Sequence, residues 1–167
     1  MSALARYVLP MTILAAVGSG AMAGLLFAFS NFVMKALTKL PHEQGMAAMP
    51  FINVAIINPV FLFLLLGTAV LCVLLVVHSI FRWHGASSLW LLVGSGCYLL
   101  GMLGITLAFN VPLNNALAET QASAVAAEAW PSYVNSWLGW NHVRTAMSFV
   151  AAASFTLAAS FLRGLGA

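Results

Sequence analysis

Four stretches of the sequence are long and apolar enough to cross a bilayer as helices: residues 9–34, 51–77, 88–111 and 140–162. A hydrocarbon core about 30 Å thick needs about 20 helical residues to span it. The stretches lack the alternation of barrel strands, and a backbone surrounded by lipid must make its hydrogen bonds internally, as a helix does. We therefore predict an all-α fold, a single integral membrane domain over residues 1–167 built as an antiparallel bundle of four transmembrane helices.

The composition excludes several other classes of protein. Only 5% of the residues are charged and 63% are apolar, whereas about a quarter of the residues in a soluble globular domain are charged. The six Lys and Arg residues are scattered, so nucleic acid is not an expected partner. Ala21-Met22-Ala23 resembles a signal-peptidase site, but the apolar run continues past it and is too long for a signal peptide. We therefore expect membrane lipid to surround the helices of this chain.

The predicted connections between the helices are residues 35–50, 78–87 and 112–139. Pro112 is expected to end the third helix, because proline has no N–H group and its ring obstructs the preceding turn. Residues 114–130 are rich in alanine and could form a short surface helix within the last connection. Pro131 suits the first turn of the fourth helix.

Positive charge is balanced between the two ends of the bundle. Cytoplasmic loops of membrane proteins are enriched in Lys and Arg. Three such residues fall at each end: Arg6, Arg82 and Arg163 with the termini and the short connection, and Lys35, Lys39 and Arg144 opposite. If Lys35 and Arg144 belong to the bundle interior, they do not count as loop charges. The termini are then expected to be cytoplasmic.

Small residues recur at four-residue intervals in two of the predicted helices. The stripes are Ala16, Gly20, Gly24 and Ala28 in the first, and Ser148, Ala152, Thr156 and Ser160 in the fourth. Helices in lipid associate through close packing at small residues, so we interpret the stripes as internal packing, with a homo-oligomer as the alternative. Cys72 and Cys97 lie at similar depths, and we interpret them as small buried hydrophobic residues rather than a disulfide.

Polar side chains gather at the end of the bundle opposite the termini. The clusters are Asn31 with Lys35, Asn53 with Asn58, Asn110 with Asn114, and the stretch WLGWNHVR from Trp137 to Arg144. An up-down-up-down topology brings these four clusters together, which predicts a polar pocket. Within the fourth helix, Trp137 and Asn141 share a face with Thr145 and Ser148, with Arg144 on one flank and His142 on the other.

Each of these polar residues could have a purely structural role instead of a role in a functional site. Single Asn side chains often hold membrane helices together by hydrogen bonds, and Lys or Arg near a helix end often reaches lipid phosphates. However, polar groups inside membranes are costly, and several at one depth indicate a functional site. The predicted spans contain no acidic residue, since Glu43, Glu119 and Glu128 all fall in connections. Arg144 is therefore suited to an anionic ligand, a developing oxyanion, carbonyl groups or a lipid phosphate.

At these same residues the chain resembles a family of small four-helix membrane proteins that includes the fungal anthrone oxygenases. The matching stretches are GLLFAFSNFVMKAL, FINVAIINPVF, NVPLNNALA and WLGWNHVRT, in the expected order along nearly the whole chain. The resemblance implies a four-helix membrane fold and the oxidation of an anthrone-type aromatic molecule by dioxygen. Neither a cofactor nor a metal is expected, because the sequence has no HExxH motif and no carboxylate-histidine array.

We assign hypothetical roles from the chemistry of the residues. Histidine can exchange a proton near neutral pH, so His142 is the predicted base. Arg144 and Asn141 are predicted to hold the oxyanion. The remaining candidates bind the substrate: Trp137 or Trp140 as an aromatic wall, Asn53, Asn58, Asn110 and Asn114 as hydrogen-bonding groups, and Lys35 as a second positive charge.

Three other functions stay open at this point. The same pocket could bind or pass a quinone, a lipid or another hydrophobic aromatic molecule without turnover, which protein-dependent oxygen consumption would exclude. The chain could be a structural subunit of a larger membrane complex, in which case the isolated protein should be unstable or co-purify with a partner. A thiol oxidoreductase is the least favoured, because Cys72 and Cys97 lie too deep for exchange with a soluble partner.

Overall fold

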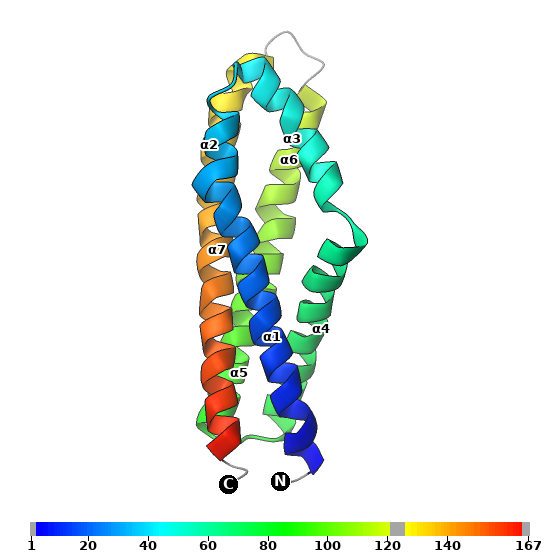
Figure 1. Ribbon diagram of the computed structural model, residues 1–167, viewed down its shortest axis with the longest axis vertical. Helices are drawn as coiled ribbons and strands as arrows, with labels where there is room; N and C mark the ends of the chain where they lie inside the picture. Colours follow the sequence, from blue (N-terminus) through cyan, green and yellow to red (C-terminus); the bar gives the residue numbers. More distant parts are fainter. Residues whose placement is uncertain (1–2, 121–125, 165–167) are drawn as a thin grey trace.

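The computed structural model describes residues 3–120 and 126–164, which form a long bundle of helices, with no strand in these ranges (Figure 1). The label η marks π-helical stretches, whose turns are wider than those of an α-helix. The elements are α1 (Ala3–Ala28), η1 (Phe29–Val33), α2 (Met34–Leu37), α3 (His42–Ile56), α4 (Pro59–Phe81), α5 (Ala86–Gly96), η2 (Cys97–Gly104), η3 (Thr106–Asn110), α6 (Val111–Thr120) and α7 (Ala126–Gly164). The predicted all-α class is confirmed.

Within the described residues, four helical spans are long and apolar enough to cross a membrane: Tyr7–Leu37, Pro59–Phe81, Ala86–Glu119 and Glu128–Arg163. They alternate in direction, and the start of α1 and the end of α7 lie at the same end of the bundle (Figure 1). The predicted four-helix bundle is confirmed, and its composition is that of a multi-pass membrane protein. On which side of the membrane the termini lie stays a prediction.

The predicted connection over residues 112–139 is helical wherever it is described and belongs to the third and fourth spans. The third span continues through Pro112 to Thr120, and α7 begins at Ala126 with Pro131 inside it. Pro112 does not end the helix because the wide π-helical turns of η3, directly before it, leave room for its ring. The described parts of the expected surface helix, residues 114–130, belong to α6 and α7, and residues 121–125 lie outside the described chain.

The second predicted helix, residues 51–77, is two helices. α3 begins at His42, inside the predicted connection, and the chain leaves helical geometry at Ile57 and Asn58 before α4 starts at Pro59. A residue before proline avoids the helical conformation, and Asn58 is extended, with φ −119° and ψ 164°. Its side chain then caps α4 by accepting from the amides of Val60 and Phe61, both at 3.1 Å.

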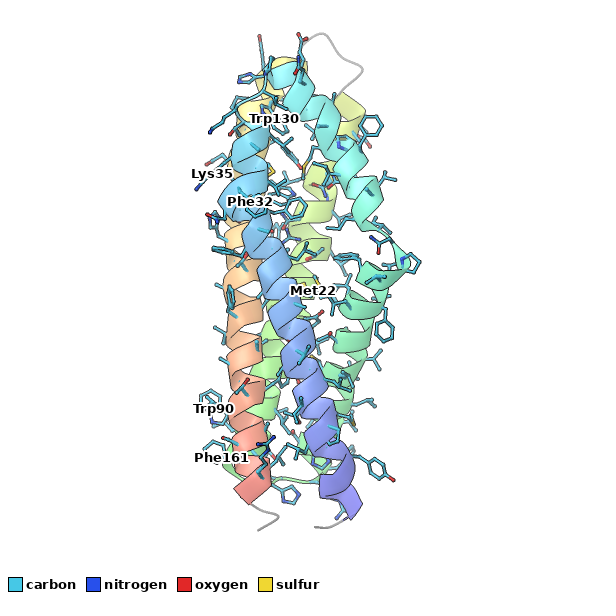
Figure 2. The ribbon with its side chains drawn as sticks, viewed as in Figure 1. Met22, Phe32, Lys35, Trp90, Trp130 and Phe161 are labelled. Carbon is cyan, nitrogen blue, oxygen red and sulfur yellow. The ribbon has the colours of Figure 1, made fainter. Side chains whose placement is uncertain are left out.

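The buried side chains form two clusters, one in each half of the bundle. The closed half, nearest the termini, is formed by α1, α4, α5, η2 and the end of α7, and is centred on Cys72, Leu75, Tyr98, Met102 and Phe155. The open half is formed by α2, α3, α6 and the start of α7, and is centred on Met34, Met49, Leu117, Trp130 and Trp137. Figure 2 shows Trp130 near the end of the open half and Met22 at mid-bundle.

Close helix packing occurs where a glycine faces a large side chain, and the predicted small-residue stripes mark it only in part. A Cβ atom at Gly94 would lie 2.9 Å from the Phe155 ring, and one at Gly101 would lie 2.5 Å from Met147. In the first stripe Gly24 is exposed, with nothing within 4 Å of a Cβ built on it, so its predicted packing role is wrong. In the fourth helix Ser148 is buried, whereas Thr156 and Ser160 are exposed. Both cysteines are free thiols, as expected.

Candidate functional site

A cavity of about 300 Å³ lies at the boundary between the two halves, and its wall includes Met22 and Met102 from the closed half and Trp137 from the open half. Apolar side chains from α1, α4, η2 and η3 make most of its wall. The polar residues that line it come from the third and fourth spans and from α3: Asn53, Thr106, Asn110, Asn114, Asn115 and Arg144. The topology therefore brings polar residues of three distant sequence segments around one largely apolar space.

Arg144 is the charged residue among the described ones that line the cavity, and it is held firmly. Its side chain is only 6% exposed. One guanidinium nitrogen donates to Thr106 Oγ1 at 3.1 Å, and another donates to Asn141 Oδ1. The guanidinium carbon lies 5.5 Å from the centre of the Trp137 ring, within cation–π range. Because both hydrogen-bond partners are neutral, the positive charge of Arg144 is oriented but not neutralised.

Asn141 positions Arg144 rather than contacting the cavity. It is fully buried, and its amide nitrogen donates to the Leu26 carbonyl at 2.8 Å and to Ser30 Oγ at 2.7 Å. Its amide oxygen accepts from Arg144. Asn141 thus joins the first helix to the fourth and fixes the guanidinium, whereas the sequence suggested that it would hold an oxyanion directly.

Three buried polar atoms on cavity-lining residues have no hydrogen-bond partner within the described residues. They are Oδ1 of Asn110, Nε1 of Trp137 and Nε of Arg144. An unpaired buried polar atom costs about 1–3 kcal/mol, so all three would gain from a ligand with hydrogen-bonding groups. Two of the atoms are donors and one is an acceptor.

Asn53, Asn114 and Tyr133 form the polar end of the site. The Tyr133 hydroxyl donates to Asn114 Oδ1 at 2.9 Å and also interacts with Asn53. Tyr133 is not among the site residues predicted from the sequence. However, Tyr133 precedes Trp137 by four residues, so both lie on one face of a helix. Thr106 precedes Asn110 by the same four residues, so Thr106 and Asn110 also lie on one face of their helix.

Besides Asn141, four of the predicted site residues do not line the cavity. His142 is exposed on the outer face of α7, with Nδ1 2.6 Å from the Leu138 carbonyl. Lys35 is exposed on the outer side of α2 (Figure 2). Trp140 stacks on Phe109, with ring centres 3.7 Å apart, and is not a lining residue. Asn58 is exposed and caps α4.

Helical geometry explains the separation of His142 from Arg144. Residues two apart on an α-helix point about 200° away from each other, so a helix that buries Arg144 must turn His142 outward. The sequence predicts Arg144 and His142 on the two flanks of one helix face, but only one of these two side chains can point into the bundle. In the described part of the chain, no three His, Cys, Asp or Glu side chains come together in a metal-binding arrangement.

The sequence model of the anthrone oxygenase family matches residues 59–154, more than half of the chain. The matched range contains Asn110, Trp137, Asn141 and Arg144, and it begins at the first residue of α4. No curated protein and no solved structure matches the chain. The chain belongs to the anthrone oxygenase family.

Proposed function

We propose that this protein is a membrane-embedded oxygenase that oxidises an anthrone-type aromatic ketone within the cavity. The observation that carries the proposal is the buried guanidinium of Arg144, which is oriented by neutral partners and lines an apolar cavity in a member of this family. The volume, about 300 Å³, lies at the small end of the range for sites that bind small molecules, about 300–1,000 Å³. A flat molecule of three fused rings suits such a space.

The proposed reaction converts a methylene group into a carbonyl group. The anthrone first loses a proton from the methylene carbon opposite its ketone, and the resulting enolate carries negative charge on the ketone oxygen. The enolate carbon then reacts with dioxygen to give a hydroperoxide, which loses water. One oxygen atom of dioxygen becomes the new carbonyl oxygen, and the other leaves as water with the two methylene hydrogens.

Arg144 favours the first step because it places positive charge where the enolate becomes negative. Preorganised donors directed at a developing oxyanion are commonly the largest single contribution to catalysis. The unpaired Nε of Arg144 and Nε1 of Trp137 would donate to this oxygen, and Oδ1 of Asn110 would accept from a neighbouring hydroxyl group. The apolar wall excludes water from the rings and strengthens these interactions.

Proton removal is assigned to water at the polar end of the cavity, beside Asn114 and Asn115. The described lining residues include neither histidine nor carboxylate. His142, the base predicted from the sequence, lies on the outer face of α7 and is not included in the proposed machinery. Enolate stabilisation by Arg144 then replaces a strong protein base.

The test is oxygen consumption by the purified protein in lipid nanodiscs with anthrone as substrate. Wild-type protein should convert anthrone to anthraquinone with one dioxygen consumed per product. Arg144→Leu should lower kcat/KM by about a hundredfold to a thousandfold, whereas Arg163→Leu, an exposed arginine of the same helix, should not change it. Equal rates in both variants and the wild type would refute the role of Arg144.

A second function, binding of a quinone or related molecule without turnover, is favoured by one observation. The described cavity-lining residues supply donors and an acceptor for the oxygens of a ring system but no evident base. In that case the wild-type protein should bind anthraquinone, and Arg144→Leu should bind it more weakly. The rate of anthrone oxidation in the presence of the protein should then equal the uncatalysed rate.

A further inference from the structure

The cavity has a rim of apolar residues that are both lining and exposed. Ile57 is 63% exposed and Leu107 is 62% exposed, although both line the cavity. Leu62 and Val111 share these two properties. A side chain can border an internal space and remain exposed only where that space reaches the surface. We call this opening, between Ile57 and Leu62 on one side and Leu107 and Val111 on the other, the mouth.

The mouth lies beside the junction between α3 and α4. The chain bends outward at this junction (Figure 1), and the Asn58 side chain holds the bend from both sides. Its amide nitrogen donates to the carbonyls of Ala55 at 3.2 Å and Ile56 at 3.3 Å, while its oxygen caps α4. The cavity lies between this wall of the bundle and η3.

The surface around the mouth is apolar on both sides of the bend. Phe51 and Val54 in α3, and Val60 and Phe63 in α4, are strongly exposed. Leu100 in η2 is also strongly exposed. A surface of this kind is stable in contact with lipid chains rather than water. The mouth therefore opens sideways into the hydrocarbon part of the bilayer, and only its far border, at Asn115, is polar.

We propose that the ligand enters the cavity laterally from the bilayer through the mouth, so that the protein selects neutral aromatic molecules dissolved in the membrane. This inference rests on the proposed function for the identity of the ligand, although the route itself rests on the mouth alone. A ligand that enters ring first brings no charge across the apolar rim. Its oxygen-bearing edge then meets Arg144 and Asn110, which compensate the desolvation of its polar groups.

The experiment narrows the mouth without altering the polar end. In the double variant Ile57→Phe/Leu107→Phe, an enlarged side chain stands on each side of the opening. The matched control is Val70→Phe/Leu89→Phe, which places the same side chains on α4 and α5 at exposed positions that are not part of the mouth and do not line the cavity. All four positions are exposed, so both variants should fold, and circular dichroism and thermal unfolding check this.

The measurement is stopped-flow quenching of tryptophan fluorescence when anthraquinone is delivered in lipid vesicles to the protein in nanodiscs. Trp137 lines the cavity, so the phase that reports entry is the one absent in Trp137→Phe. We expect the association rate to fall by about tenfold or more in the Ile57/Leu107 variant and to stay within about twofold of wild type in the control. An anionic anthraquinone sulfonate should give no such phase in any variant.

The outcomes separate the route from the activity. Equal association rates in the narrowed and control variants overturn lateral entry, and so does rapid entry of the sulfonate. A slowed association rate supports lateral entry even if anthrone is not oxidised, in which case the oxygenase proposal alone fails. Normal oxidation of anthrone with an unchanged kcat/KM in the narrowed variant overturns the route and leaves the oxygenase proposal in place.

Discussion

The closed and open halves of the bundle share its first, third and fourth spans but are packed by different means. In the closed half, Gly94 and Gly101 each face a large side chain of α7, and Tyr98 and Phe155 are completely buried. Toward the open half, the chain bends at Asn58 between α3 and α4, and amides and Arg144 line a largely apolar cavity at the boundary of the two halves. The comparison shows that close packing stabilises the bundle at one end, while hydrogen bonds position a site at the other.

After Arg144→Leu, the largest effect on the site should come from Asn141→Leu. This change removes the amide that orients the Arg144 guanidinium and leaves the Ser30 hydroxyl and the Leu26 carbonyl without this partner. Displacement of an oriented group can lower the rate by up to about a hundredfold. Because Asn141 acts through Arg144, anthrone kinetics should show a loss in kcat larger than the rise in KM.

Asn135→Leu is the control for that variant, since Asn135 is exposed on the same helix. It should leave both kinetic constants unchanged. Restoration of activity in Asn141→Gln would support positioning by hydrogen bonds. A purely structural role for Asn141 would instead lower thermal stability while kcat per folded protein stayed constant.

The closed half should respond most strongly to Gly94→Val. The new side chain would overlap the Phe155 ring, because a Cβ atom alone would lie 2.9 Å from it. Overpacking of this kind costs about 1–3 kcal/mol. Gly96→Val, two residues along the same helix, meets nothing within 4 Å and serves as the control. Thermal unfolding in detergent should show a lower Tm for the first variant only, and equal values would contradict the described packing.

Asn110→Leu tests the unpaired acceptor of the open half. The substitution removes Oδ1 together with an amide that donates to the Trp137 carbonyl at 3.3 Å. Loss of one hydrogen bond to a ligand should weaken anthraquinone binding by about tenfold. Stability should change little, since an unsatisfied buried group disappears at the same time. Asn31→Leu, exposed and outside the cavity, is the comparison, and equal affinities in the two variants would exclude Asn110 from the site.

Asn58→Ala should loosen the bend that separates the two halves. Loss of a helix cap costs about 1 kcal/mol, and the amides of Val60 and Phe61 lose their acceptor. Hydrogen exchange should therefore become faster at these two amides and remain unchanged at Gly94 and Gly101 in the closed half. Uniformly faster exchange across both halves would show that the bend is not a local feature.

His142→Ala should have the smallest effect. His142 is exposed on the outer face of α7, so anthrone oxidation should stay within about twofold of wild type. A general base contributes about a hundredfold or more. A loss of that size in kcat/KM, without a loss of stability, would return His142 to the mechanism as the base and would contradict proton transfer to water.

Much of the arrangement could be predicted because it follows from local rules. Long apolar stretches require helices in lipid, and alternating direction brings Asn110 and Arg144 to the same end. Asn58-Pro59 carried a local indication of the bend, since a residue before proline avoids the helix. The extension of the third helix through Pro112 was missed because the same rule gave the wrong answer beside the π-helical turns of η3.

The sequence by itself determined the helical class, the membrane location of the spans, the end at which polar residues gather, and the family. Only the tertiary structure decided that Arg144 faces inward while His142 and Lys35 face outward, and that Asn141 holds Arg144 instead of a ligand. The physical reason is that spacing fixes angles between residues of one helix but not the rotation of that helix about its axis. In a helix that is apolar on every side, this rotation is set by contacts with neighbouring helices.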